Sequence, residues 1–88
     1  MLTFDDCLAL AELTEEEVDA IAEHEHLPEM VALELGAYLA RSAEGQRRIE
    51  HMIVDDIEAA HRRGDPLHAA QLKRVLRHFC LEHPHRKG

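Results

Sequence analysis

Apolar residues recur three and four positions apart along nearly the whole chain, and no segment shows a sustained alternation of apolar and polar residues. The first pattern places apolar side chains on one face of an α-helix, whereas alternation would indicate a β-strand. Only short stretches interrupt the pattern, so the connections between helices must be short. The sequence therefore predicts an all-α fold, a compact bundle of four to five short helices.

Residues that favour helix starts divide this pattern into segments. Thr14 is followed by Glu17, and Thr3 by Asp6, with side chains spaced so that each can bond to the other's backbone N–H. Pro28 suits the first turn of a helix, and Asp65 before Pro66 combines an N-cap with proline at the first helical position. These signals predict helices over about residues 3–11, 14–26, 28–41, 46–63 and 65–81.

One boundary is open, at the Ser-Ala-Glu-Gly stretch of residues 42–45. We expect a break or bend there, because the apolar pattern is interrupted. The alternative is a single helix over residues 28–63, roughly 54 Å long at the standard rise per residue. Such a rod is too long for a compact domain of this size and would indicate an intertwined oligomer.

The chain has room for one modest core. It has 88 residues, of which 45% are apolar but only 3% aromatic, so the core must be mainly aliphatic. We expect a single domain over residues 1–82, followed by a frayed tail over residues 83–88. A core this small is marginal alone, so we also expect that self-association or a protein partner completes the bundle.

Charge is divided unevenly between the two halves. Residues 1–40 contain eleven acidic residues and no Lys or Arg, whereas residues 41–88 contain all ten Lys and Arg against seven acidic residues. Two interpretations are open: the halves lie against each other and partly neutralise, or the chain self-associates with acidic faces against basic ones. An acidic chain without clustered cations is not expected to bind nucleic acid.

Several other classes of protein are disfavoured. No apolar run approaches the length of a membrane span, and the N-terminus lacks the basic region of a signal peptide. The two cysteines, Cys7 and Cys80, show no disulfide framework, which favours a reduced, cytoplasmic location. No glycine-rich phosphate loop and no Ser-His-Asp arrangement is present, so the sequence nominates no catalytic residue and no organic cofactor.

Three carboxylates stand out by their position. Glu25 and Asp56 fall on otherwise apolar helix faces, and Glu34 lies between Met30 and Tyr38 in a segment that is apolar nearly all round. Such a segment usually lies at the centre of a bundle, so we expect these carboxylates to be buried. A buried carboxylate needs an arginine, a histidine or a metal ion beside it. For Asp56, the expected partner is Arg47 or Arg74.

Histidine is unusually abundant, with eight in the chain, and Glu-x-x-His occurs three times, ending at His26, His61 and His85. Residues three positions apart share a helix face, so both side chains can reach one ion. In ligand types and spacing, the pattern resembles the ferritin-like di-metal carboxylate bundles. That resemblance implies a site for a transition metal such as iron or zinc, with these candidate ligands: Glu25, His26, Glu29, Glu34, Glu58 and His61.

Two functions follow from these patterns. The first is a small non-enzymatic interaction or regulatory module that acts through self-association or a protein partner. The second, an alternative, is a histidine/carboxylate metal-binding protein whose site is assembled between helices.

Overall fold

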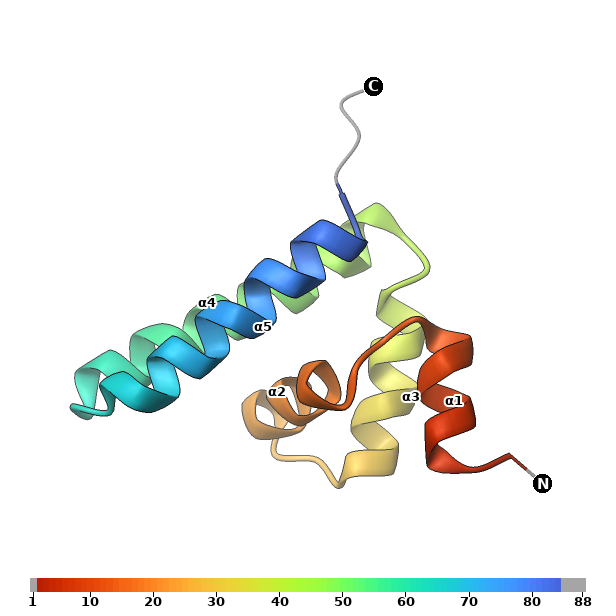
Figure 1. Ribbon diagram of the computed structural model, residues 1–88, viewed down its shortest axis with the longest axis horizontal. Coiled ribbons are helices and arrows are strands. Elements are labelled where there is room, and N and C mark those ends of the chain that lie inside the picture. Colours follow the sequence, from red (N-terminus) through yellow and green to blue (C-terminus); the bar gives the residue numbers. More distant parts are fainter. Residues whose placement is uncertain (1, 85–88) are drawn as a thin grey trace.

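Two long antiparallel helices project from a group of three shorter ones in the computed structural model, which describes residues 2–84 (Figure 1). The predicted all-α fold is confirmed, and the described residues contain no strand. In chain order the helices are α1 (Phe4–Ala11), α2 (Glu15–Glu25), α3 (Glu29–Leu39), α4 (Ala43–Arg62) and α5 (Pro66–Glu82). We call α1–α3 the body and α4–α5 the hairpin.

The predicted start signals all act at helix N-termini. Thr3 with Asp6, and Thr14 with Glu17, form complete capping boxes at α1 and α2. The Asp65 side chain accepts the backbone N–H of His68, with Pro66 in the first turn of α5. Pro28 is the N-cap of α3, one position before the predicted first turn, and makes no side-chain cap.

The chain breaks between α3 and α4, so residues 28–63 are two helices and not one rod. α3 ends at Leu39, and the Ser42 hydroxyl accepts the N–H of Gly45 to begin α4. Gly45 is buried, and a Cβ there would lie 2.6 Å from the carbonyl carbon of Leu39. Only glycine permits this close approach of the two helix ends.

The core is aliphatic, as composition requires, with Phe79 as its one fully buried aromatic side chain among the described residues. The predicted apolar faces of the hairpin point inward. From the body, α2 packs against both helices of the hairpin. The largest fully buried apolar side chains come from these three helices: Val18, Ile21, Ile49, Ile53 and Phe79.

The prediction that residues 28–41 form a surrounded, central helix is wrong. α3 buries Ala32, Leu33, Gly36 and Leu39, whereas Met30, Val31 and Tyr38 are 47%, 44% and 69% exposed. The chain extends 41 × 36 × 17 Å along its principal axes. In so thin a molecule α3 packs against α1, α2 and α4, and these contacts leave Met30, Val31 and Tyr38 exposed.

The limits of the domain remain a prediction. The position of His83, the first residue of the predicted tail, is given by the structure. Its side chain is buried, and its ring stacks on that of Phe79 with a centroid distance of 4.4 Å. His83 therefore packs against the end of α5, whereas the sequence predicts it within the frayed tail. Residues 85–88, the rest of that tail, lie outside the described residues.

Candidate functional site

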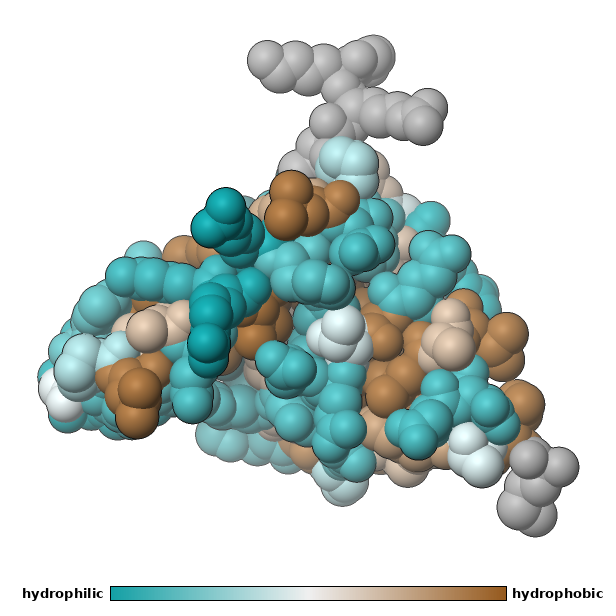
Figure 2. Space-filling view, viewed as in Figure 1, coloured by the Kyte–Doolittle hydropathy of each residue, from teal (hydrophilic) through white to brown (hydrophobic). Residues whose placement is uncertain are grey.

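An open groove of about 520 Å³ runs between α1 and α3. Seven apolar or small side chains line it: Cys7, Leu10, Ala11, Met30, Leu33, Ala37 and Ala40. The carboxylates of Glu12 and Glu34 lie along the same groove, and Arg41, Gln46 and His83 close one end. Figure 2 shows the apolar surface over α1 and α3 as a brown area on the body.

The groove stays open because α1 is short and lightly docked. Its eight residues are held by caps at both ends, with Glu12 in the left-handed conformation at φ 57°. Leu8 is its one buried residue, while Leu10 projects outward and is 73% exposed. A helix of this length does not persist alone, so its few apolar contacts with α3 must hold it.

Of the three polar side chains at this end of the groove, Gln46 and His83 have partners within the chain, whereas Arg41 forms no ion pair among the described residues. Gln46 donates its amide N–H to the carbonyl of Ala40 at 2.8 Å, and His83 Nδ1 lies 3.2 Å from the carbonyl oxygen of Phe79. The other polar groups that line the groove are the charged side chains of Glu12, Glu34 and Arg41. The groove is therefore suited to apolar side chains with charged ones beside them.

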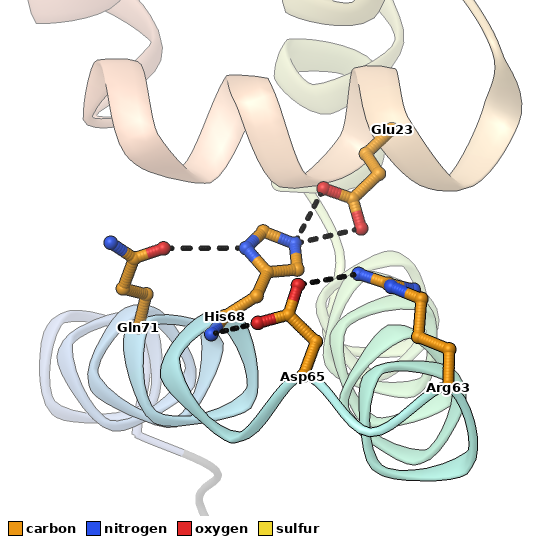
Figure 3. Close-up of polar contacts among 5 residues, drawn as sticks. All are labelled: Glu23, Arg63, Asp65, His68 and Gln71. Carbon is orange, nitrogen blue, oxygen red and sulfur yellow. Dashed lines mark hydrogen bonds and ion pairs between the residues drawn. The ribbon is translucent and has the colours of Figure 1, made fainter.

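A second feature is a line of histidine–carboxylate contacts that joins α2 to the hairpin. His68 on α5 lies with Nε2 2.8 Å and 3.0 Å from the two oxygens of Glu23 on α2, while Nδ1 is 3.3 Å from Oε1 of Gln71 (Figure 3). Asp65, at the start of the same helix, forms an ion pair with Arg63 at 3.7 Å. Burial lowers the pKa of His68, but the hydrogen bonds with Gln71 and Glu23 outweigh it and raise that pKa.

His24 occupies the same kind of position between α2 and α4. Its Nδ1 is 2.7 Å from Glu25, and its Nε2 is 3.3 Å from Asp55. Partial burial lowers the pKa of His24, yet the hydrogen bonds to these two carboxylates raise it above its usual value. Both ring nitrogens face oxygen acceptors, and only the protonated imidazolium can donate to both.

Glu17 is the buried carboxylate that sequence reasoning missed. It is 1% exposed; one oxygen accepts the Thr14 backbone N–H at 2.9 Å, and the other lies 3.1 Å from Nδ1 of His78. The capping-box spacing identified its bond to Thr14. Its burial and its partner, 61 positions along the chain, left no local signal.

Asp56 is buried, as its position on an apolar face predicts. The expected ion pair with Arg47 or Arg74 is wrong, since neither arginine lies within ion-pair distance of Asp56, and its Oδ2 has no hydrogen-bond partner among the described residues. Burial raises the pKa of Asp56, and the nearby Glu23 and Asp55 raise it further, against the opposing effect of His24 and His68.

The other two predicted buried carboxylates are exposed, so those predictions are wrong. Glu25 is the last residue of α2, where the helix leaves the core and its side chain turns to His24. Glu34 does share the α3 face of Met30 and Tyr38, but all three side chains are exposed in the described part of the chain.

The proposed metal ligands do not converge within one chain. His26 is the exposed left-handed cap of α2, and Glu58 and His61 lie exposed on α4. In the described part of the chain, one group of three potential ligands comes together, namely Glu15, Asp19 and Glu29, and all three are exposed. Of the predicted set, this group contains Glu29 alone. Exposed acidic groups of this kind are common without an ion, so the group supports no site.

Comparison of the chain with protein-family models, with curated proteins and with solved structures found no match. Within residues 2–84, no helix has both the length and the apolar character needed to cross a membrane.

Proposed function

We propose that this chain is a non-enzymatic protein-interaction module whose groove between α1 and α3 binds an amphipathic helix of a partner. One observation supports the proposal above others: Leu10 and Met30, 73% and 47% exposed, line an open apolar groove in a small helical domain. Contiguous exposed apolar surface of this kind usually marks an interaction site. Recognition of a helix in a groove relies on apolar side chains three and four positions apart.

The charges beside the groove favour a particular kind of helix. Glu12 and Glu34 line it, with Arg41 at one end, and the body around the two carboxylates carries acidic residues but no Lys or Arg. A partner helix with an apolar stripe flanked by Arg or Lys would bury the stripe and face these carboxylates. Electrostatic complementarity of this kind gives specificity and a faster association rate.

A selection experiment tests this function. A displayed library of amphipathic helical peptides would be selected on the folded protein, and the affinities of enriched peptides measured by fluorescence anisotropy with the fluorophore attached to the peptide. We expect enriched sequences to carry an apolar stripe with basic flanks. The substitutions L10D and M30D should each weaken binding at least about tenfold, equivalent to about 1.4 kcal/mol.

The matched control is V54D, an equally drastic change at Val54, an exposed apolar residue on α4 that does not line the groove. V54D should leave peptide affinity unchanged. Circular dichroism would verify that all three variants are folded, as expected for substitutions at exposed positions. Failure to enrich any peptide, or equal loss of binding in V54D, would overturn the proposed function.

A further inference from the structure

The outer face of α5 carries a stripe with the chemistry that the groove requires. Five exposed residues lie three and four positions apart, so they share one face of the helix: Leu67, Ala70, Arg74, Arg77 and Leu81. Leu67 and Leu81 are 71% and 72% exposed, unusually high for leucine in a well-packed helix. The stripe is thus apolar at both ends and basic in the middle, over about 21 Å of helix.

The basic charges of this stripe are not neutralised within the chain. All three ion pairs that join α2 to the hairpin use histidine: His24 with Asp55, His68 with Glu23, and His78 with Glu17. Among the described residues, neither Arg74 nor Arg77 forms an ion pair; Arg74 only shares a shallow cleft with Glu16 and Asp19. The arginine side chains therefore remain available to carboxylates of another molecule.

The stripe and the groove lie on the same side of a flat molecule. In Figure 2 the darkest teal, most hydrophilic side chains lie over α5, beside the brown surface over α1 and α3. Two copies related by a two-fold axis can therefore meet face to face, each placing its basic helix on the other's acidic, apolar body. A pair of this kind closes on itself and makes the contact twice.

We propose that the partner helix is α5 of a second copy of this chain, which rests on the groove function proposed above. Leu81 enters the groove beside Leu10 and Met30, and Arg74 and Arg77 face the carboxylates of Glu12 and Glu34. His83, at the end of α5, lines the groove of its own chain. The C-terminal ends of the two α5 helices therefore lie close to the two-fold axis.

A charge exchange monitored by sedimentation velocity tests the pairing, with full-length protein over a dilution series. The wild-type chain should form a dimer that weakens between about 0.1 M and about 1 M salt, because the matched charges are screened. R74E/R77E and E12K/E34K should each raise the dimer dissociation constant at least tenfold. Mixing these two variants should restore a heterodimer, and the chain with all four substitutions should dimerise with itself.

Two controls make the result specific. R47E/R48E reverses two exposed arginines of α4 outside the stripe and should leave the dimer unchanged, while L81D should abolish it. A dimer that is indifferent to the charge exchange would overturn the inference. So would a wild-type monomer at every concentration, but if that monomer still bound selected peptides through Leu10, the proposed groove function would stand. A wild-type chain that neither dimerises nor binds selected peptides would overturn both proposals.

Discussion

The carboxylate of Glu17 on α2 lies 3.1 Å from Nδ1 of His78 on α5, and it is one of the most deeply buried groups in the described chain. Its other oxygen caps the start of its own helix through the Thr14 backbone N–H. One side chain thus joins the beginning of α2 to the C-terminal half of α5. Two further contacts, between His68 and Glu23 and between His24 and Asp55, extend the line along α2.

Removing the Glu17 side chain should destabilise the protein strongly. E17A deletes both the cap and the partner of His78 and leaves a buried space, so we expect the free energy of unfolding to fall by about 2–3 kcal/mol. E17Q keeps an acceptor for Thr14, because glutamine also completes a capping box, and should cost only about 1 kcal/mol. Urea denaturation followed by circular dichroism measures both. Equal losses in the two variants would contradict this prediction, because they would show that the cap retained in E17Q contributes nothing to stability.

The three histidines should make the protein more stable at mildly acidic pH than at mildly basic pH. The pKa values of His24, His68 and His78 are raised in the fold; for His78 the main cause is the hydrogen bond that it donates to the Glu17 carboxylate. A raised histidine pKa contributes stability fully below the unfolded value of about 6.5, and this contribution is lost as the pH rises through the folded pKa. The side chains are partly exposed, so we expect a loss of about 1 kcal/mol in all between pH 6 and pH 8.

Urea denaturation at constant ionic strength across that range measures the loss. The variant H24Q/H68Q/H78Q cannot be charged at these positions and should show a flatter profile over the same interval. A wild-type protein whose stability rises from pH 6 to pH 8 would contradict the assignment of charged histidines to these contacts.

Replacing Asp56 by a neutral side chain should raise the free energy of unfolding. Its buried Oδ2 has no hydrogen-bond partner within residues 2–84, and burial raises its pKa. Because the folded pKa is raised, the cost of ionisation is absent below the unfolded value of about 3.9 and complete above the folded pKa. We expect D56N to stabilise the protein by about 1 kcal/mol at pH 7, and less at about pH 4.

The neighbouring Asp55 is the matched control for this substitution. It is exposed and lies 3.3 Å from Nε2 of His24, so D55N removes a favourable contact and should lower the free energy of unfolding by at most about 1 kcal/mol. The two substitutions differ by one position and should have opposite signs. A loss of stability in D56N would contradict the argument from burial.

Local signals in the sequence predicted the helices well because those signals act over a single turn. Thr3 with Asp6, Thr14 with Glu17, and Asp65 each satisfy backbone groups that lie within three residues. Periodicity also placed Asp56 correctly on the buried face of α4. In a long helix with one strongly apolar face, the direction of the core follows from the sequence alone.

The candidate site depended on contacts between helices, which no local pattern reveals. α3 is apolar on nearly every side, so its sequence did not indicate which side faces solvent, and Met30 was placed in a central helix although it lines an open groove. The abundant histidines suggested a metal site. Three of them instead contact carboxylates across helix interfaces, and their partners lie tens of residues away in the chain.

The corner between α3 and α4 should tolerate no side chain at position 45. A Cβ on Gly45 would lie 2.6 Å from the Leu39 carbonyl carbon and 2.7 Å from its Cα. Because these are backbone atoms, G45A can be accommodated only by moving one helix end away from the other, and we expect a loss of about 3 kcal/mol. At Gly36 in the middle of α3, a Cβ would instead meet the terminal methyl groups of Ile21 and Leu13 at 2.9 Å and 3.0 Å. Those flexible ends can shift, and alanine gains about 1 kcal/mol of helix propensity over glycine, so G36A should change stability by less than about 1 kcal/mol. Urea denaturation of the two single variants measures the contrast. Similar losses in both would show that the α3–α4 corner is not held by this close backbone approach.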